Sequence, residues 1–504
     1  MPSTRNNNLF SYLILPIYAL AFNQFAFITA DPDLWGHIKF GEEIWNQKSL
    51  PPTNFYSYTA PAYPWINHEW LSEIIFYAIY SLFGSTGLLV FKCLLGQLLV
   101  HIICIYNLKN KANPWVLTVL LLLIIPVLAP GFMVRPHLWT LLFFTIFILL
   151  LHKGLGGKPK ALYGIPLLML AWVNCHGGVV AGLGIFAVVT LAEGLRSLIS
   201  GENTWKPLLA SFLCSCLAVL INPSGISLWE FFYHSLSQPR NISEWNPVPL
   251  WGTQFIFLKI LVTLFLATLF IPGKKQLWKI IIICISIYFG FKHQRHTILT
   301  VIILAFYLPL YLSKGLEIWG ARFPSLFTTT KINFPAKILL TLFIILQLLD
   351  GYSKYNQNQL KIWVEPQVYP TYLAQFMREN QLKGNIIVPF DWGEYLIWKL
   401  PSSKISIDGR FRTAYPEEII NWNQKVYSIQ NPDPQLLNKY PADFIVVRKK
   451  NAPINYLAEN TQWVKIYEDL MAILFVSKNQ ASILKEFALE KLIQSKEPPS
   501  LNFP

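Results

Sequence analysis

Residues 30–70 read ADPDLWGHIKFGEEIWNQKSLPPTNFYSYTAPAYPWINHEW and separate the first apolar segment from everything that follows. This stretch, with its four tryptophans, also carries most of the acids and imidazoles of the early chain, namely Asp31, Asp33, His37, Glu42, Glu43, His68 and Glu69. A loop this polar, set between apolar runs, is where the chemistry of the protein is expected.

The composition around this loop indicates a membrane protein. Of 504 residues, 53% are hydrophobic and only 13% are charged, against roughly 25% charged in an ordinary soluble domain; the mean hydropathy is +0.40. The net charge of +14 comes from basic residues in short stretches between apolar runs. That pattern follows the positive-inside rule, so we expect the lipid bilayer and not nucleic acid as a partner.

The apolar runs predict about eleven membrane-spanning helices, since a helix needs roughly 20 residues to cross the hydrocarbon core. The runs are 9–29, 85–106, 115–131, 137–152, 161–175, 178–199, 207–222, 253–271, 277–291, 297–313 and 335–350. The run 71–83 is too short and too acidic at its start to span. We expect it to lie at the interface or to pack on the bundle.

The positions of Lys and Arg predict the orientation of these spans. With the N-terminus in the cytoplasm every inner loop is basic, as the positive-inside rule requires. The same threading places outside the loops around 30–84, 132–136, 174–177, 223–252 and 292–296, together with residues 351–504. We therefore expect a multi-pass protein of the plasma (inner) membrane whose C-terminal part is external or periplasmic.

The domain organisation follows from a change of pattern after residue 350. We predict an α-helical transmembrane domain at 1–350, with its external loop at 30–84, a linker at 351–367, a soluble α/β domain at 368–480 and a tail at 481–504. Predicted helices at 369–380, 393–400 and 417–429 alternate with predicted strands at 384–390, 404–408 and 442–448, and a strand pair at 463–469 and 471–477 closes the domain. Such alternation is typical of an α/β fold.

The polar motifs between the spans gather on the outer face. MVRPH supplies Arg135 and His137, and WVNCHGG supplies Asn174 and His176 in a tight connection between two spans. Glycines permit such a turn, but the turn itself needs neither Asn nor His. The alternative for Arg135 is a side chain that snorkels from a helix end to the interface.

A basic cluster, FKHQRH, stands on the side where basic residues should be scarce. It contains Lys292, Arg295 and His296. Lys and Arg form charge-assisted hydrogen bonds with phosphate, so this cluster, with Arg135, predicts a site for a lipid-linked phosphate. The alternative is contact with anionic lipid headgroups. Glu244, in the loop 222–252, is a supporting candidate, or it belongs to a capped loop anchored at the interface.

The acids of the first loop allow two interpretations. Pro32 suits the start of a helix, and Asp31 would then cap that helix. Alternatively, Asp31 and Asp33, supported by His37 and by the pair His68 and Glu69, hold a divalent cation such as Mg²⁺ or Mn²⁺ or remove a proton from a hydroxyl.

Two motifs of the C-terminal part follow predicted strands. Asp391 lies in DWGEY, whereas Asp408 and Arg410 lie in IDGR. The carboxyl ends of strands are where α/β sheets place ligand sites, which favours acceptor binding; an internal Asp–Arg ion pair with a glycine turn is the alternative. The chain has no Walker loop, dinucleotide fingerprint or G-x-S-x-G motif, which argues against nucleotide-driven and serine-hydrolase chemistry.

The motifs DPDLWGHIKFGE, NHEWLSE, WVNCHGG, INPSG, SEWNP, DWGEYLIWKLP and IDGR together resemble a group of bacterial polytopic membrane proteins described as glycosyltransferase-like. More broadly, an acidic motif after the first of about eleven spans, with a C-terminal domain, resembles the GT-C glycosyltransferase superfamily. The resemblance implies transfer of a sugar from a polyprenyl-phosphate donor to an acceptor on the outer face of the plasma membrane. It maps the acidic base or metal ligand onto Asp31 or Asp33.

A non-catalytic role in lipid or polysaccharide transport or assembly is the other function class. A transporter should carry ionisable residues near mid-span and often shows inverted repeats. Here the ionisable residues cluster at the predicted outer face and no clear repeat is seen. Both observations favour the enzyme.

Overall fold

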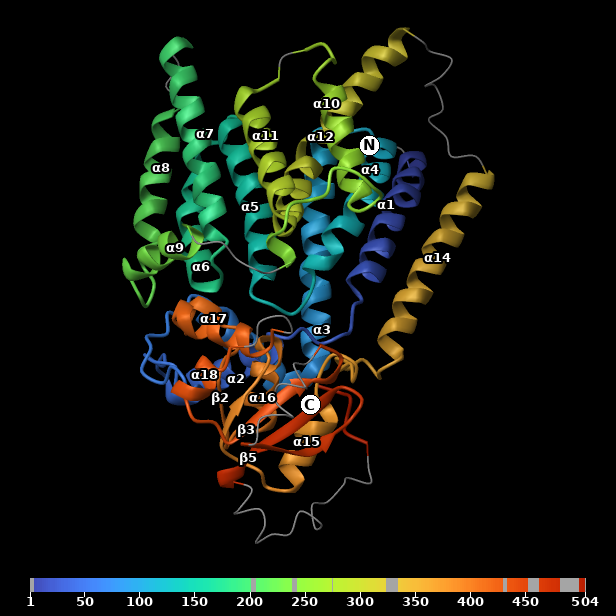
Figure 1. The fold of residues 1–504 in the computed structure, drawn as a ribbon. Helices are drawn as coiled ribbons and strands as arrows, with labels where there is room; N and C mark the ends of the chain where they lie inside the picture. The colour runs from blue at the N-terminus through green and yellow to red at the C-terminus, as the bar shows by residue number, and fades with distance from the viewer. Residues whose placement is uncertain are drawn as a thin grey trace. The chain divides into compact units, whose positions relative to one another are not determined.

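The computed structural model describes residues 4–200, 205–237, 243–273, 275–322, 334–428, 433–451, 462–480 and 498–503. The chain forms two compact units (Figure 1). We call Met1–Phe27, Leu89–Ile226 and Leu236–Leu360 the helical unit, and Ile28–Leu88, Ser227–Ser235 and Lys361–Pro504 the sheet unit. Most of the predicted tail lies outside the described residues.

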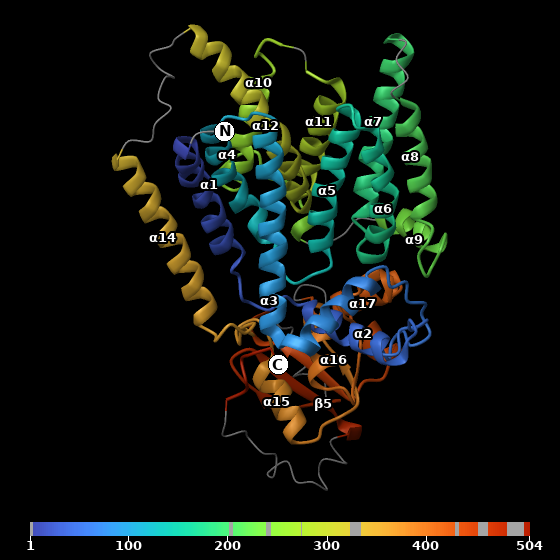
Figure 2. The ribbon, with the colours of Figure 1, turned by 180° about the vertical axis from the view of Figure 1, so that it is seen from behind.

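The helical unit contains every predicted apolar run as a helix. Its helices are α1 (Thr4–Phe25), the later part of α3 (Trp70–Lys109), α4 (Pro114–Leu128), α5 (His137–Leu155), α6 (Gly164–Cys175), α7 (Val179–Ser200), α8 (Trp205–Ala218), α10 (Ile256–Thr268), α11 (Leu277–Lys292), α12 (Thr297–Arg322) and α14 (Phe334–Asn356). Figures 1 and 2 show most of them running side by side as a bundle.

The predicted count of about eleven spans is not confirmed. Among the described residues, 6 helices are long and apolar enough to cross a membrane. They are Trp70–Lys109, Pro114–Gly131, His137–Leu155, Val179–Ser200, Gln294–Gly320 and Phe334–Asn356. Others, such as Trp205–Ala218 and Ile256–Thr268, are apolar but shorter, because the sequence runs that predicted them end in turns and not in further helix.

Two helices, α3 and α14, differ from the predicted apolar runs in where they are interrupted or end. Gly84, with φ of 62° and ψ of −161°, interrupts α3 between the two predicted runs 71–83 and 85–106. Both runs are helical; the interfacial position of the first stays a prediction. α14 packs beside α1 (Figure 2), and the ring centroids of Phe22 and Tyr355 are 5.7 Å apart. α14 continues to Asn356, into the predicted linker.

The sheet unit is built on a five-stranded mixed sheet in the order β2-β1-β3-β5-β4. The strands are β1 (Asn385–Ile387), β2 (Lys404–Ile405), β3 (Phe444–Arg448), β4 (Trp463–Glu468) and β5 (Ala472–Ser477). β1 runs parallel to β2 and β3, whereas β5 is antiparallel to β3 and β4. The predicted strands and the closing pair are therefore confirmed.

The helices of the sheet unit also match the predicted alternation. They are α2 (Leu34–Gln47), the start of α3, α9 (Ser227–Ser237), α15 (Thr371–Glu379), α16 (Gly393–Lys399), α17 (Glu417–Val426) and α18 (Gln435–Lys439). α2 comes from the first loop and α9 from the loop 223–252, where no span was predicted.

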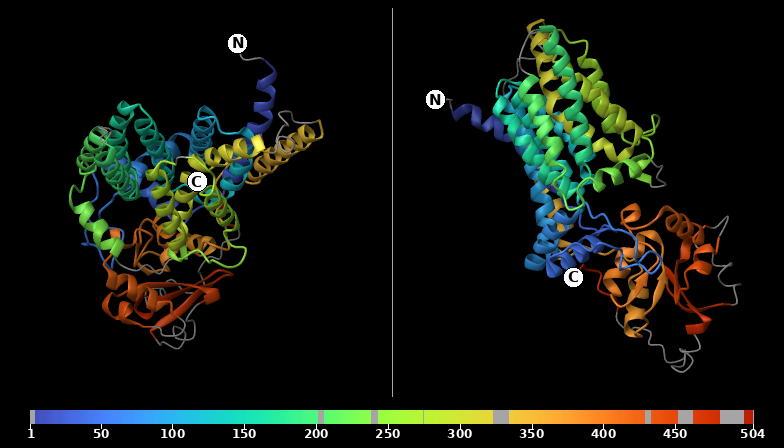
Figure 3. Two further views of the ribbon diagram at one scale, coloured as in Figure 1. Left: turned by 90° about the horizontal axis from the view of Figure 1, so that it is seen from above. Right: turned by 90° about the vertical axis from the view of Figure 1, so that its left-hand side faces the viewer.

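The first loop is folded into the sheet unit (Figure 3). Phe40 and Trp65 belong to the same buried core cluster as Ile387 and Ile445 of the sheet. The loop also pairs with the edge strand β2, since the Ile405 N–H donates to Tyr56 O at 3.1 Å and the Tyr58 N–H donates to Ile405 O at 3.2 Å. Burial of these aromatic side chains and backbone pairing with the edge strand β2 thus hold the acidic loop on the C-terminal domain.

Candidate active site

The two aspartates of the first loop have different surroundings. Asp31 is buried, and its Oδ1 accepts a hydrogen bond of 3.0 Å from the backbone N–H of Asp33. Its carbonyl accepts from the Leu34 N–H at 3.1 Å, so Asp31 orders the turn that leads into α2. Asp33 is the N-cap residue of α2 but makes no side-chain capping bond. The predicted helix is present, with Asp33 and not Asp31 at its N-cap position.

Glu394 of α16 reaches the first turn of α2. Its Oε2 accepts from the Gly36 N–H at 3.1 Å, and Glu394 is buried. Gly409 lies against both acids: a Cβ built there would be 2.6 Å from Asp33 Oδ1 and 2.7 Å from Glu394 Oε1. The structure therefore brings a first-loop aspartate and a C-terminal glutamate to the same backbone position.

A second acidic cluster lies on α2 and at the start of α3. His37, Glu69 and Glu73 each offer a ligand atom, and these atoms lie within 4.8 Å of one another. His37 Nδ1 is 3.3 Å from Glu73 Oε1, while Asn67 Nδ2 donates to Glu73 Oε2 at 2.6 Å. One imidazole and two carboxylates form a donor set that fits a divalent cation.

The carboxylates around His37 change the pKa of its imidazole. Burial alone lowers the pKa of His37, but the hydrogen bond with Glu73 and the charges of Glu69, Glu73 and Asp31 outweigh burial, so the pKa is raised. The predicted partner His68 lies 3.7 Å from Glu69 Oε1 and packs its ring on Phe232 of α9. The two carboxylates make this cluster suited to a cation.

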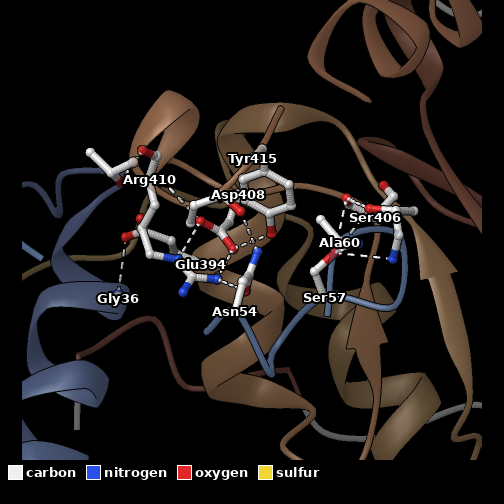
Figure 4. A network of polar contacts seen from close by, with 12 residues as sticks. Gly36, Asn54, Ser57, Ala60, Glu394, Ser406, Asp408, Arg410 and Tyr415 are labelled. Atoms are coloured by element: carbon white, nitrogen blue, oxygen red, sulfur yellow. Dashed lines mark hydrogen bonds and ion pairs between the residues drawn. The ribbon is translucent and has the colours of Figure 1, made fainter. Parts of the chain in front are cut away.

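Asp408 and Arg410 form a buried ion pair at the end of β2 (Figure 4). Arg410 donates from Nε to Asp408 Oδ1 at 2.8 Å and from Nη2 to Asp408 Oδ2 at 2.6 Å. The Tyr415 hydroxyl also donates to Asp408 Oδ2 at 2.6 Å, and Arg410 Nη2 donates to Asn54 Oδ1 at 2.6 Å. The bidentate pair therefore links IDGR to the first loop.

Aromatic rings enclose this guanidinium. The Arg410 Cζ lies 4.5 Å from the ring centroid of Trp65, 4.8 Å from that of Phe40 and 5.1 Å from that of Tyr56, all first-loop residues. Asp408 has no exposed surface. In this arrangement Asp408 and Arg410 hold the first loop, and their predicted part in acceptor binding stays a prediction.

Asp391 lies apart from that pair. Its Oδ2 accepts from Arg448 Nη2 at 2.6 Å, and the Arg448 guanidinium lies 4.8 Å from the ring centroid of Trp392. Both side chains are partly exposed. This pair sits where β1 and β3 end, which is the edge at which the sequence predicted ligand-binding residues.

In the helical unit, the hydrogen bonds around His176 define the tautomer of its ring. The Gly178 N–H donates to His176 Nδ1 at 3.0 Å, and Trp172 Nε1 donates to Thr140 Oγ1 at 2.8 Å. The Thr140 hydroxyl, 2.7 Å from His176 Nδ1, then donates to that nitrogen. His176 Nδ1 is therefore an acceptor and the proton of the neutral ring is on Nε2.

The neighbouring predicted residues fix the same turn. A Cβ on Gly178 would lie 2.2 Å from Thr140 Oγ1, so the second glycine of WVNCHGG is required for this approach. Asn174 Nδ2 donates to Ile221 O at 3.0 Å and ties the turn to the INPSG loop. His137 lies at the start of α5, with Nε2 2.6 Å from Gly131 O and its ring 6.4 Å from that of His176. Arg135 lies two residues before His137.

The two predicted loops SEWNP and FKHQRH pack together. Arg295 Nη1 donates to Glu244 Oε1 at 2.9 Å, and the Arg295 guanidinium lies 4.8 Å from the ring centroid of Trp245. His293 Nδ1 is 2.7 Å from Trp245 O. The basic cluster is thus partly neutralised by Glu244 and oriented by an aromatic ring.

Two further residues of FKHQRH, Lys292 and His296, contact aromatic rings. Lys292 is exposed and lies 5.8 Å from the ring centroid of Tyr288, while the His296 ring is 5.9 Å from that of Trp245. The structure therefore brings Glu244, Arg295 and His296 together within the helical unit. Asp31, Asp33, His37, His68, Glu69, Asp391, Asp408 and Arg410 all belong to the sheet unit.

Sequence reasoning missed three residues with contacts of functional interest. Glu73 and Glu394 lie in motifs that the sequence singled out, four residues after Glu69 and three after Asp391. Lys92, buried in α3, donates to Phe27 O. A charge inside an otherwise apolar spanning run is a signal of function that could have identified Lys92.

No protein-family model matches the chain, and no curated protein matches it in sequence. Solved structures do match. The apo oligosaccharyltransferase of Archaeoglobus fulgidus aligns with 87% of this chain and 69% of its own, at 12% identity and a TM-score of 0.55.

Two bacterial membrane proteins show the same likeness. ArnT from Cupriavidus metallidurans, bound to undecaprenyl phosphate, aligns with 94% of this chain and 98% of its own, at 12% identity and a TM-score of 0.51. The mycobacterial arabinofuranosyltransferase AftD aligns with 92% of this chain but 40% of its own, at 12% identity and a TM-score of 0.53. These neighbours are GT-C proteins, and the chain, a multi-pass membrane protein, shares their GT-C fold.

Proposed function

We propose that this protein is an integral membrane glycosyltransferase. It moves a sugar from a polyprenyl-phosphate donor to a hydroxyl of a cell-envelope lipid, glycan or protein on the outer face of the membrane. The observation that carries the proposal is the fold shared with ArnT across 94% of this chain and 98% of that one, in a structure bound to undecaprenyl phosphate.

Asp33 is the carboxylate we assign as the base. Asp31 uses its side chain to order the turn, since its Oδ1 accepts from the Asp33 N–H, whereas the Asp33 carboxylate lies against Gly409, next to Glu394. In the reaction the Asp33 carboxylate accepts the proton of the acceptor hydroxyl. The hydroxyl oxygen attacks the anomeric carbon, the bond from that carbon to the phosphate oxygen breaks, and polyprenyl phosphate leaves with inversion at carbon.

The departing phosphate carries negative charge that cations can stabilise. Arg135, Lys292 and Arg295 are the residues to which we assign donor phosphate binding. The contact between Arg295 and Glu244 supports this role, because a guanidinium already held by a carboxylate and a tryptophan face has little side-chain freedom to lose when phosphate binds.

His37, Glu69 and Glu73 are the residues that would hold a divalent cation, on the grounds of their donor set. Imidazole favours Zn²⁺, whereas the two carboxylates suit Mn²⁺ or Mg²⁺. A bound cation would supply positive charge near the acidic loop. A cation at Asp31 and Asp33 remains the alternative within the same loop.

A transfer assay in membranes tests the function. Wild type, Asp33→Asn and Asp31→Asn are compared at matched abundance with a panel of radiolabelled polyprenyl-phosphate sugars. We expect Asp33→Asn to abolish transfer, since an amide cannot act as the base. Asp31→Asn should retain most activity, because the amide oxygen can still accept from the Asp33 N–H. Asp433→Asn, in an exposed ion pair with Lys425, is the control for expression.

The outcomes separate the function classes. Loss of transfer in Asp33→Asn alone supports both the enzyme and the assigned base. Loss in Asp31→Asn alone would reverse the assignment. Abundant wild-type protein that transfers sugar from no donor would favour a role in lipid or polysaccharide transport or assembly.

A further inference from the structure

We propose that Glu394 caps α2 in place of its own N-cap residue and thereby positions the Asp33 carboxylate. Glu394 is a positioning residue in this proposal, since it acts through Asp33. The functional part rests on the proposed role of Asp33 as base, whereas the cap itself is a structural claim that can be tested without any activity.

The first argument is the missing local cap. The first-turn N–H groups of a helix have no partner within the helix, and an aspartate at the N-cap usually accepts from one of them. Asp33 does not. The Gly36 N–H instead donates to Glu394 Oε2 at 3.1 Å, 358 residues away in the chain. A negative charge at this end also interacts favourably with the helix dipole.

The second argument is close packing at two glycines, Gly36 and Gly409; Figure 4 shows Gly36 and Glu394. A Cβ on Gly36 would lie 2.2 Å from Glu394 Oε2. A Cβ on Gly409 would lie 2.6 Å from Asp33 Oδ1 and 2.7 Å from Glu394 Oε1. Glu394 is 3% exposed. Its carboxylate thus occupies a space that only glycine backbones leave open, and it adjoins Asp33 there.

The third argument is charge balance. Two neighbouring carboxylates repel each other, and a cation near them reduces that repulsion. Arg410, which is itself paired with Asp408, lies near enough to Glu394 for the two charges to interact. Burial alone would lower the pKa of Arg410, but the charge and hydrogen bonds of Asp408, with the charge of Glu394, raise it instead. The guanidinium therefore stays charged beside Glu394.

The motifs DWGEY and IDGR pack against each other and together support the position of Glu394. Gly393, at the start of α16, would place a Cβ 2.2 Å from Ile407 O and 2.6 Å from the Asp408 Cα. The glycine of DWGEY therefore lies directly on the first two residues of IDGR, just after β2. This contact fixes Glu394 relative to Arg410, and the two together hold α2.

Hydrogen–deuterium exchange of the full-length protein in nanodiscs tests the cap. In Glu394→Ala, peptides covering residues 31–47 should exchange roughly tenfold faster or more, because a hydrogen bond to a charged acceptor is lost. Glu394→Gln keeps an acceptor oxygen and should stay closer to wild type. Gly36→Ala places a methyl group in the space of the carboxylate and should reproduce the faster exchange. Glu468→Ala, which breaks ion pairs of β4 with Lys449 and Lys465, is the control.

Two results would overturn the cap. One is wild-type exchange of residues 31–47 in Glu394→Ala. The other is an acceleration that extends equally to peptides of α17, because this would reflect general loosening of the unit and not loss of a cap.

Transfer kinetics test the positioning role separately. Glu394→Ala should lower kcat at least tenfold with little change in KM for the donor, and Glu394→Gln should recover part of the loss. If Glu394→Ala exchanges faster but keeps the wild-type kcat, Glu394 caps α2 but does not position the Asp33 base. That result would overturn the positioning role and leave the cap. If wild type transfers no sugar, the proposed function fails while the exchange result still decides the cap.

Discussion

Arg410 Nη2 donates a hydrogen bond of 2.6 Å to Asn54 Oδ1, although 356 residues separate the two in the chain. Asn54 has no exposed surface, and its amide also donates to Ala414 O at 2.9 Å. One asparagine of the first loop therefore bonds on both sides to the segment that follows β2. The acidic loop is held by the C-terminal domain through buried polar groups as well as through its aromatic side chains.

The first prediction concerns how much the contact between Arg410 and the first loop stabilises the sheet unit. Arg410→Ala should destabilise the sheet unit by about 3–5 kcal/mol, because it leaves the buried Asp408 charge without its partner. Thermal unfolding of purified protein, followed by tryptophan fluorescence, measures the change. Lys425→Ala, which breaks the exposed ion pair with Asp433, is the control and should cost about 1 kcal/mol or less. Equal melting temperatures of Arg410→Ala and wild type would contradict the role of Arg410 in holding the first loop on the sheet unit.

The second prediction concerns space at Gly409. Gly409→Ala should reduce transfer at least tenfold at normal protein abundance, since the new methyl group would displace Asp33 Oδ1 and Glu394 Oε1, and small misplacements of catalytic groups cost rate. Gly184→Ala in α7, where a Cβ meets nothing within 4 Å, is the matched control. Full activity of Gly409→Ala would show that the close approach of the two acids has no role.

Much of this fold could be predicted from the sequence. Apolar runs near membrane thickness predict helices because the bilayer requires internal hydrogen bonding, and each run is helical. The alternation from Thr371 to Ser477 predicts the sheet for a similar local reason. Span count was less predictable, because apolar composition does not fix where a helix ends.

The site was harder to predict because its contacts join distant residues. Nothing in a single sequence pairs Gly36 with Glu394 or Asn54 with Arg410. The first loop was assigned to the membrane part since it is contiguous with the first spans, yet Phe40 and Trp65 pack in the core of the sheet unit. The hydrogen bond from the Asp33 N–H to Asp31 Oδ1 and the approach of Asp33 Oδ1 to Gly409 distinguish the two aspartates, and sequence spacing reveals neither.

The third prediction concerns cation binding. His37→Ala should weaken binding of Mn²⁺ by about a hundredfold or more, and Asn67→Ala by about 10- to 100-fold, because Asn67 orients Glu73 through its hydrogen bond of 2.6 Å. Titration of Mn²⁺ followed by electron paramagnetic resonance gives both values. His101→Ala removes an imidazole from the helical unit and should leave binding unchanged. Equal affinity in wild type and His37→Ala would remove this cluster as the cation site.

The fourth prediction concerns the donor phosphate. Arg295→Ala should weaken binding of polyprenyl phosphate about tenfold or more, because a charge-assisted hydrogen bond contributes about 1.5–3 kcal/mol. Glu244→Gln should not weaken it, since the carboxylate holds Arg295 at 2.9 Å but also neutralises it. Binding of a fluorescent polyprenyl phosphate in detergent gives the affinities, with Lys259→Ala as a basic-residue control. Unchanged affinity in Arg295→Ala would favour contact with ordinary anionic lipids.

The fifth prediction concerns orientation, on which an outer-face reaction depends. Alkaline phosphatase, which is active only outside the cytoplasm, should be active when fused after Ser477 and inactive when fused after Lys158, in the basic connection between α5 and α6. Basic loops are retained on the cytoplasmic side, and Lys153, Lys158 and Lys160 make this connection one of them. Comparable expression of both fusions is checked by immunoblot. The reverse pattern of activity would place the C-terminal domain and its first-loop acids in the cytoplasm, and the donor would then have to be used on that side.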